Sequence, residues 1–250
     1  MDNSTYFIDR RTIRKYADRE VSDELLRSML EQASHAPTTG NMQLYSVVLT
    51  RSAAEKQALA PMHFNQPSVE GCDVLLTFCA DFNRFVRWCE ASNADPGYDN
   101  FQSFVTAMLD TAIFAQQFVT VAEMNGLGCC YLGTTTYNAP QIAEALKLPP
   151  LVVPVTTLTV GYPDETPADS GRLSVDAIMH YGHYEYYDNE RVKMLYAEKE
   201  ARDDSRRFVA ENGKQSLAQV FTDVRYTRDA NETFSKIYAD FIVDQGFKLP

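Results

Sequence analysis

The chain has 250 residues, a formal net charge of −11 and five cysteines. This length suits one large domain or two small ones, and a hydrophobic fraction of 45% excludes general disorder. The acidic balance argues against a general nucleic-acid binder, which carries a basic face, so we expect no nucleic-acid partner.

Sequence pattern also argues against a membrane or exported protein. We find no apolar run approaching the ~20 residues of a membrane helix and no basic segment followed by an apolar stretch near the start, so we expect no membrane partner. The cysteines are odd in number and lie in apolar stretches, which predicts free buried thiols in a reducing cytoplasm.

The first third of the chain carries clear start and stop signals. Ser22 opens a helix with leucines at helical spacing, and Pro37 disfavours helix beyond position 36. The loop "PTTGN" follows, and the β-branched run 45–50 predicts a strand. The "SAAE" of residues 52–55 is a capping box that opens a short helix.

The remaining elements alternate between strands and helices. Residues 74–80 form a continuous apolar run and predict a buried strand, and a long amphipathic helix is expected over 101–125. Asn138 can cap a further helix, and 152–161 predicts a strand in which Pro154 indicates an edge or a bulge. Charged helical patterns at 189–211 and 228–245 follow, so the pattern favours an α/β or α+β core with a helical extension.

Three segments carry candidate binding chemistry. The first, "RRTIRKY", places Arg10, Arg11, Arg14 and Lys15 around Thr12. In an extended backbone Arg10, Thr12 and Arg14 share one side, and arginines beside a hydroxyl suit phosphate oxygens. A solvated charged face is the alternative for this segment taken alone.

The other two segments are built around glycine. The loop 35–43 offers Thr38, Thr39, Asn41 and Gln43 around Gly40, a set that suits ring edges and phosphates, with an ordinary turn as the alternative. The segment "GLGCCYLGTT" follows the long helix but lacks the GxGxxG fingerprint. No Cys or carboxylate cluster accompanies the histidines, so we expect no metal.

Taken in order, these segments resemble the nitroreductase family of flavoproteins. The resemblance rests on "RRTIRKY", "APTTGNMQLYSVV", "YLGT" and "GYPDETPADSGRL", and it includes the group of the major oxygen-insensitive nitroreductase and the NADPH-flavin oxidoreductase of luminous bacteria. It implies an α+β fold in which helices flank a mostly antiparallel sheet. It also implies an FMN-binding core at 1–187, with a helical extension at 188–250 packed on the core or on a partner subunit.

The resemblance assigns FMN contacts residue by residue. Arg10 and Thr12 hold the phosphate with Arg11 beside them, and Arg14 reaches the N1–O2 edge, where positive charge stabilises reduced flavin. The remaining contacts fall in the later motifs: Thr38, Thr39, Asn41, Gln43, Gln66, Tyr131, Leu132, Gly133, Thr134 and Arg172. The Gly133 backbone lies near flavin N5, Gln66 bonds the pyrimidine edge, Arg172 is a second phosphate arginine, and part of the polar loop comes from the other subunit.

The activity implied is that of an NAD(P)H-dependent nitroreductase or flavin reductase with no catalytic side chain. Hydride passes by a ping-pong mechanism from NADPH or NADH to FMN, and then to a nitroaromatic, a quinone or free flavin. Lys214 is the one cation in the stretch where some relatives bind the NADPH 2′-phosphate with an arginine, so both nucleotides stay open. The alternatives are a relative that dehalogenates or breaks down flavin and a flavin-binding protein of low turnover.

The resemblance also implies a homodimer. The helix at 101–125 has more apolar surface than one small core needs, and the family dimerises through this helix. We therefore expect a cytoplasmic homodimer.

Overall fold

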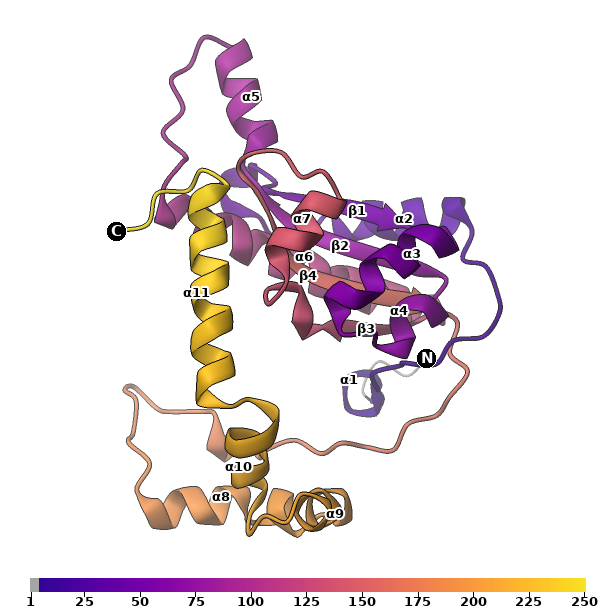
Figure 1. Cartoon of the computed structure of the whole chain (residues 1–250), viewed down its shortest axis with the longest axis vertical. Coiled ribbons are helices and arrows are strands. Elements are labelled where there is room, and N and C mark those ends of the chain that lie inside the picture. The colour runs from indigo at the N-terminus through magenta and orange to yellow at the C-terminus, as the bar shows by residue number, and fades with distance from the viewer. Residues whose placement is uncertain (1–4) are drawn as a thin grey trace. The chain divides into compact units, whose positions relative to one another are not determined.

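The computed structural model describes residues 5–250, whose helices and strands are drawn in Figure 1. The chain divides into two compact units. The first comprises residues 1–167 and 234–250, and the second comprises residues 168–233.

A four-stranded sheet forms the centre of the first unit. Its strands are β1 (Tyr45–Thr50), β2 (Val74–Asp81), β3 (Gly128–Leu132) and β4 (Val152–Gly161). They lie in the order β1-β2-β4-β3, and every neighbouring pair is antiparallel. The expected α+β fold with an antiparallel sheet is therefore confirmed.

Pro154 lies in an interior strand, because β4 has β2 on one side and β3 on the other. The register of β2 against β4 shifts between Phe78 and Cys79, and Cys79 is the partner of Pro154. The prediction of a bulge is confirmed and that of an edge is wrong: the bulge accommodates a residue that cannot donate to the ladder.

Helices surround the sheet in the first unit. The α-helices are α1 (Tyr6–Asp9), α2 (Asp23–Ala33), α3 (Ala53–Leu59), α4 (Pro67–Gly71), α5 (Asn83–Ala91), α6 (Phe101–Met124) and α7 (Ala139–Ala145). Short 3₁₀ turns are η1 (Thr39–Asn41), η2 (Ala60–His63) and η3 (Gly133–Thr135). Two predicted caps are confirmed: the Ser22 side chain caps α2, and Ser52 and Glu55 form a capping box on α3. Helix α7 does begin after Asn138, but the Asn138 side chain does not cap it, because its Nδ2 donates to Met62 O instead.

The two faces of the sheet pack against different helices (Figure 1). On one face Leu76 and Phe78 of β2 share a core cluster with Met29 of α2 and Phe118 of α6. On the other face Leu75 packs with residues of α3 and α4. The neighbours Cys129 and Cys130 fall into these two clusters separately, as expected for successive strand residues, and all five cysteines are free and buried.

Helix α6 is the central helix of this unit. Among the described residues 5–250 it is the one helix long and apolar enough to cross a membrane by length and composition, with 44% of its apolar window buried. The expectation that no segment approaches a membrane helix is corrected here. Its apolar composition serves the core, since ten residues from Ser103 to Ala122 are buried and several share a cluster with β2.

The N-terminal segment after α1 crosses the pair β3–β4 at two glycines. Gly128 and Gly161 are register partners, and a Cβ added to Gly128 would lie 2.5 Å from the Ile13 side chain. A Cβ on Gly161 would lie 2.9 Å from the Tyr16 ring. Only glycine allows this approach, and the Ile13 N–H then donates to Cys129 O at 3.2 Å.

The second unit is helical and contains no strand among its residues 168–233. Its elements are η4 (Val175–Ala177), α8 (Asn189–Ala201), α9 (Asp203–Glu211), α10 (Leu217–Val220), the π-helical turn η5 (Phe221–Arg225) and the start of α11 (Arg228–Asp244). The predicted run 189–211 is two helices, because Arg202 adopts an extended conformation between them.

The observed unit boundaries differ from the predicted division at residue 187. The end of α11 returns to the first unit, where Phe241, Ile242 and Phe247 are buried in a cluster with Phe104. The physical reason is that the last apolar residues complete the core around α6 and α7.

Candidate functional site

The basic segment lies along strand β3, an edge strand of the sheet. Two contacts fix it to the sheet: Ile13 N–H donates to Cys129 O of β3, and the Tyr16 hydroxyl lies 2.6 Å from Thr159 Oγ1 of β4. Residues 10–15 have no regular secondary structure.

Arg10 makes an ion pair with Glu123 near the end of α6. Its Nε donates to both carboxylate oxygens, at 3.0 and 3.2 Å, and Nη2 lies 3.0 Å from Oε1. Tyr6 donates a further hydrogen bond of 2.7 Å to Glu123 Oε2. Glu123 therefore engages two of the three nitrogens of the Arg10 guanidinium and leaves Nη1 for another anion.

Arg14 presents its side chain at the surface while its backbone is anchored. Glu165 Oε1 accepts from the N–H groups of Arg14, at 2.6 Å, and Lys15, at 3.0 Å. These bonds lower the pKa of Glu165, and the bond from the Arg14 N–H has the largest effect. Burial raises the pKa of the Cys130 thiol and the Arg14 guanidinium opposes this rise, which places that cation beside β3.

Beyond β3 the chain turns at Leu132 and Gly133. Leu132 is buried, Gly133 is exposed, and a Cβ added to Gly133 would meet nothing within 4 Å. Tyr131, the residue before this turn, is 39% exposed, and its hydroxyl lies 3.4 Å from Gln116 Oε1. The turn thus offers open backbone at the end of the strand to which the basic segment is bonded.

A second turn packs beneath this one. His63, the last residue of η2, is fully buried, and its Nδ1 lies 2.9 Å from Thr134 Oγ1. Phe64 and Asn65 follow with positive φ angles of 55° and 51°, and they lead to the half-buried Gln66. The structure therefore brings the predicted Gln66 to the same side of the sheet as the Gly133 turn.

The polar loop is held elsewhere, by a buried carboxylate of α6. Asp110 is 2% exposed and accepts from Thr38 Oγ1 at 2.5 Å, from Thr39 N at 3.0 Å and from Thr39 Oγ1 at 2.9 Å. Asn41 and Gln43 are exposed, with φ angles of 56° and 54°. The two threonines are thus structural anchors, and the two amide side chains face outward.

The polar loop and the basic segment lie far apart within one chain. Asp110 and Glu123, their respective partners, are thirteen positions apart on α6, which corresponds to roughly 20 Å along the helix. The loop also precedes β1 and the basic segment covers β3, the two opposite edges of the sheet. Within one chain the predicted site residues therefore form two separate groups, one at the polar loop and one at the β3 edge.

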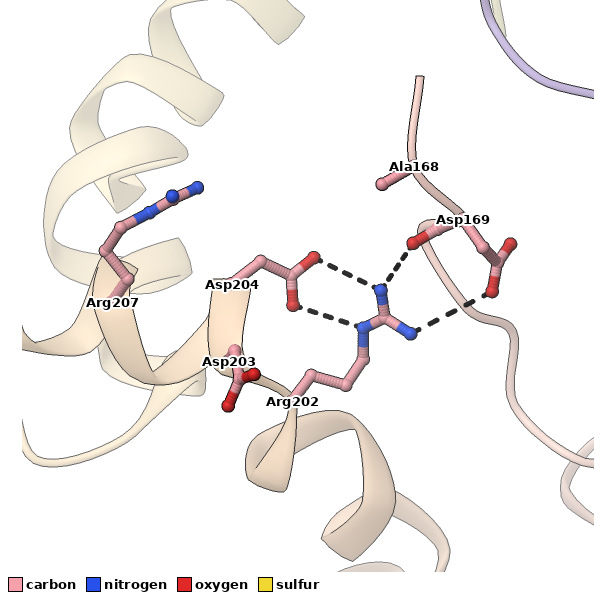
Figure 2. A pocket seen from close by; sticks show the side chains of 6 residues that line it. All are labelled: Ala168, Asp169, Arg202, Asp203, Asp204 and Arg207. Carbon is pink, nitrogen blue, oxygen red and sulfur yellow. Dashed lines mark hydrogen bonds and ion pairs between the residues drawn. The ribbon is translucent and has the colours of Figure 1, made fainter. Parts of the chain in front are cut away.

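Arg172 belongs to the second unit. Its Nη1 donates to Ser170 Oγ at 2.9 Å and to Gly171 O at 2.6 Å. Nearby, Arg202 binds this segment from between α8 and α9: its Nη2 donates to Asp169 O at 2.5 Å, and its Nε donates to Asp204 Oδ1 at 3.1 Å (Figure 2). The Arg202 guanidinium therefore orders the backbone just before Arg172.

Figure 2 shows the cavity around Arg202, which has a volume of about 640 Å³. Asp169 and Asp204 converge on the guanidinium, while the Arg207 side chain stands apart from this network. Since two carboxylates neutralise Arg202, the cavity has little positive charge to offer a ligand.

The donor set at the β3 edge fits FMN chemically. A dianionic phosphate needs cations and hydroxyls, which Arg11, Thr12 and the remaining nitrogen of Arg10 supply. A flat ring needs an open backbone face, which Gly133 offers at the end of the strand to which the basic segment is bonded. Residues 5–250 contain no group of three potential metal ligands close together.

Sequence reasoning missed the residues that position this site. Asp110 and Glu123 carry the only charges in α6, and a lone carboxylate in an apolar helix was the available signal for each. His63 and Glu165 had no such signal, because each contact joins residues distant in sequence.

The chain is similar to characterised proteins along its whole length. The sequence profile of the nitroreductase family matches residues 8–162. A crystal structure from Bacteroides fragilis, described as an oxidoreductase, is 51% identical, covers 96% of this chain and 98% of that one, and superposes with a TM-score of 0.95.

Two enzymes are also similar. The FMN reductase (NADPH) of Bacillus subtilis is 27% identical over 96% of both chains. The oxygen-insensitive NADPH nitroreductase of Salmonella typhimurium is 30% identical over 75% of this chain and 76% of that enzyme.

Proposed function

The chain belongs to the nitroreductase family, and from this premise we propose that it is an FMN-dependent NAD(P)H oxidoreductase. Similar enzymes named as an FMN reductase (NADPH) and an oxygen-insensitive NADPH nitroreductase support this assignment. The observation that carries it in this chain is the basic segment bonded to β3, by Ile13 N–H to Cys129 O, with the open Gly133 turn at the end of the same strand.

The N-terminal segment binds the phosphate in this proposal. Arg10, Arg11 and Thr12 line this end of the site, and Arg10 contributes less than its sequence position suggests because Glu123 neutralises it. The resemblance supports Arg172 as a second phosphate arginine. Charge-assisted hydrogen bonds to a phosphate are shorter and stronger than neutral ones, so this end of the site supplies most of the affinity.

The ring end of the site sets orientation and electrostatics. Bound FMN supplies the redox chemistry, taking a hydride from NAD(P)H and passing two electrons to an acceptor. With FMN bound, Arg14 would place positive charge at the pyrimidine edge, Gln66 would bind the same edge, and the backbone of Gly133 would face the ring. No acid–base side chain is needed, and an open face over a planar ring accepts flat nitroaromatics, quinones or free flavin.

The complete enzyme is a homodimer in this proposal. The polar loop with Asn41 and Gln43 lies at the opposite sheet edge from Arg14, so a second subunit would supply it to each flavin. Exposed apolar residues of α6, including Leu109 and Ile113, give the two subunits a surface to share. Five free buried thiols are in keeping with a reducing cytoplasm.

Cofactor analysis of the purified protein tests the proposal. We expect a yellow protein that releases FMN on denaturation, with about one FMN per chain, and that oxidises NADPH or NADH in the presence of a nitroaromatic or a quinone. A colourless protein that takes up no added FMN would overturn it.

A further inference from the structure

His63 is a buried histidine in the first unit that the proposed chemistry does not use. Its side chain is completely inaccessible to solvent, and burial lowers its pKa to about 4, so the imidazole is neutral at neutral pH. Its Nδ1 makes a hydrogen bond of 2.9 Å with the hydroxyl of Thr134, which is itself buried.

The other imidazole nitrogen is unpaired. Nε2 is buried and has no hydrogen-bond partner among the described residues. An unsatisfied buried polar atom costs about 1–3 kcal/mol, whereas an apolar side chain of similar volume would fill the same space without that cost. Packing alone therefore does not account for a histidine here, and the bond to Thr134 is the contact that an apolar residue would lack.

This bond connects two turns of the proposed site. Thr134 directly follows Gly133, so its hydroxyl fixes the peptide that leads out of the Leu132–Gly133 turn. His63 lies three residues before Gln66. The hydrogen bond thus joins the backbone expected beside flavin N5 to the side chain expected at the pyrimidine edge.

Other contacts hold the same two turns together. Asn138 Nδ2 donates to Met62 O at 2.6 Å, directly beside His63. The Phe64 and Tyr137 rings lie 6.4 Å apart, and Tyr137 stacks on Phe234 at 4.4 Å. These contacts fix the outer parts of the turns, and the His63–Thr134 bond is the one nearest to Gly133 along the chain.

We propose that His63 is a positioning residue for flavin reduction: its bond to Thr134 sets the separation between the Gly133 turn and Gln66. This inference rests on the proposed function. It assigns His63 no contact with FMN or substrate. The imidazole acts through Thr134 and determines how closely the backbone at Gly133 approaches the ring.

Three variants separate positioning from packing. Thr134→Val removes the hydroxyl at nearly constant shape, and His63→Leu removes the imidazole nitrogens. His63→Asn keeps a polar nitrogen or oxygen near the position of Nδ1. Thr77→Val is the matched control, because Thr77 is also buried and its hydroxyl pairs with another threonine, Thr157, at 3.3 Å.

The experiment uses the FMN-loaded protein and two measurements. The first is amide hydrogen exchange of peptides covering residues 131–137, and the second is the anaerobic rate at which NADPH or NADH reduces the flavin. We expect faster exchange and about a tenfold slower reduction in Thr134→Val and in His63→Leu, because misplaced reacting groups slow transfer. The double variant should be no slower than either single one, and His63→Asn should recover most of the rate.

The inference is overturned if Thr134→Val behaves like Thr77→Val in both measurements, or if the effects of the two single variants add in the double variant. Failure of the parent protein to be reduced by either nucleotide would instead refute the proposed function. In that case the hydrogen-exchange measurement on its own still decides whether the bond orders the turn: unchanged exchange in Thr134→Val would reject it.

Discussion

At the residue scale, the cations of the N-terminal segment have different partners and therefore different roles. Arg10 is paired within the protein by Glu123, whereas the Arg14 guanidinium lies at the surface beside β3. The common sign of their charge does not make them equivalent. Whether a carboxylate pairs with the guanidinium decides how much positive charge each arginine offers to a ligand.

The ion pair between Arg10 and Glu123 predicts a coupled effect on stability. Arg10→Ala leaves the Glu123 carboxylate, which is 10% exposed, without its cation, so we expect the free energy of unfolding to fall by about 2 kcal/mol. The double variant Arg10→Ala/Glu123→Ala should lose less than the sum of the single variants. Urea unfolding of the four proteins measures this coupling, and strictly additive losses would show that the pair contributes nothing.

Burial of His63 predicts a pH dependence of stability. Its folded pKa is lowered to about 4 from 6.5, so between these values the unfolded chain binds a proton that the folded protein does not. The stabilisation is present above pH 6.5 and is lost as the pH falls toward 4. Between pH 7 and pH 5 the parent protein should lose about 2 kcal/mol more than His63→Asn.

Urea unfolding at both pH values, with FMN at the same saturating concentration, checks this prediction. Carboxylates titrate in both proteins and cancel in the difference. Equal pH slopes for the parent and for His63→Asn would mean that the imidazole is already protonated at pH 5 in the folded state.

At the element scale, local signals predicted most of the core. Both serine caps and three of the four strands were predicted from side-chain spacing and capping chemistry, because these depend on neighbours within a few residues. Strand β3 was not predicted. Helix α5 was missed: the carboxylate that caps its first turn is Asp81, the last residue of β2, so its start signal lies inside a buried strand. The break at Arg202 carries no proline or glycine and depends on tertiary contacts.

The candidate site was predictable as a set of motifs but not as an arrangement. The order of the basic segment, the polar loop and the glycine turn indicated the family, and each lies on the element expected for it. Which carboxylate holds each motif could not be predicted, because Asp110 and Glu123 lie 71 or more positions away in sequence from the groups that they bind. Hydrogen bonds across such separations follow from the fold and have no local pattern.

Alanine substitution at two glycines, one in β3 and one in the turn after it, should affect stability differently. Gly128→Ala would place a methyl group 2.5 Å from Ile13, so it should displace the basic segment, lower stability by about 1–3 kcal/mol and weaken FMN binding. Gly133→Ala meets nothing within 4 Å, so it should fold normally and yet bind FMN more weakly, because the methyl group would occupy the space proposed for the ring.

Gly97→Ala is the control for both, since that position is also open and lies outside the proposed site. Thermal unfolding and FMN titration of the three variants give the comparison. Normal FMN binding by Gly133→Ala would remove this turn from the cofactor site.

At the scale of the whole molecule, the site of one chain is incomplete. The polar loop and the basic segment lie at opposite sheet edges, and in the proposed dimer each flavin takes one from each subunit. A hybrid of two defective subunits should therefore regain function. In a hybrid of Arg14→Ala with Asn41→Gly, one of the two sites has both parent residues.

We expect such hybrids to recover up to about half of the parent activity, while each variant alone stays low, because each homodimer carries the same defect in both sites. Asn41→Gly is chosen because glycine adopts the φ of 56° without strain. Light scattering confirms the dimer independently. If the hybrids are no more active than either variant alone, the polar loop and Arg14 of one chain serve the same flavin.

The central claim is that this chain holds FMN at the β3 edge and reduces it with a nicotinamide nucleotide. Anaerobic mixing of the purified yellow protein with NADPH and, separately, with NADH tests this most directly. We predict that the visible flavin band is bleached in a single turnover by at least one nucleotide, and that it returns when a quinone or nitroaromatic is added. A protein whose bound flavin keeps its colour with both nucleotides would contradict the account.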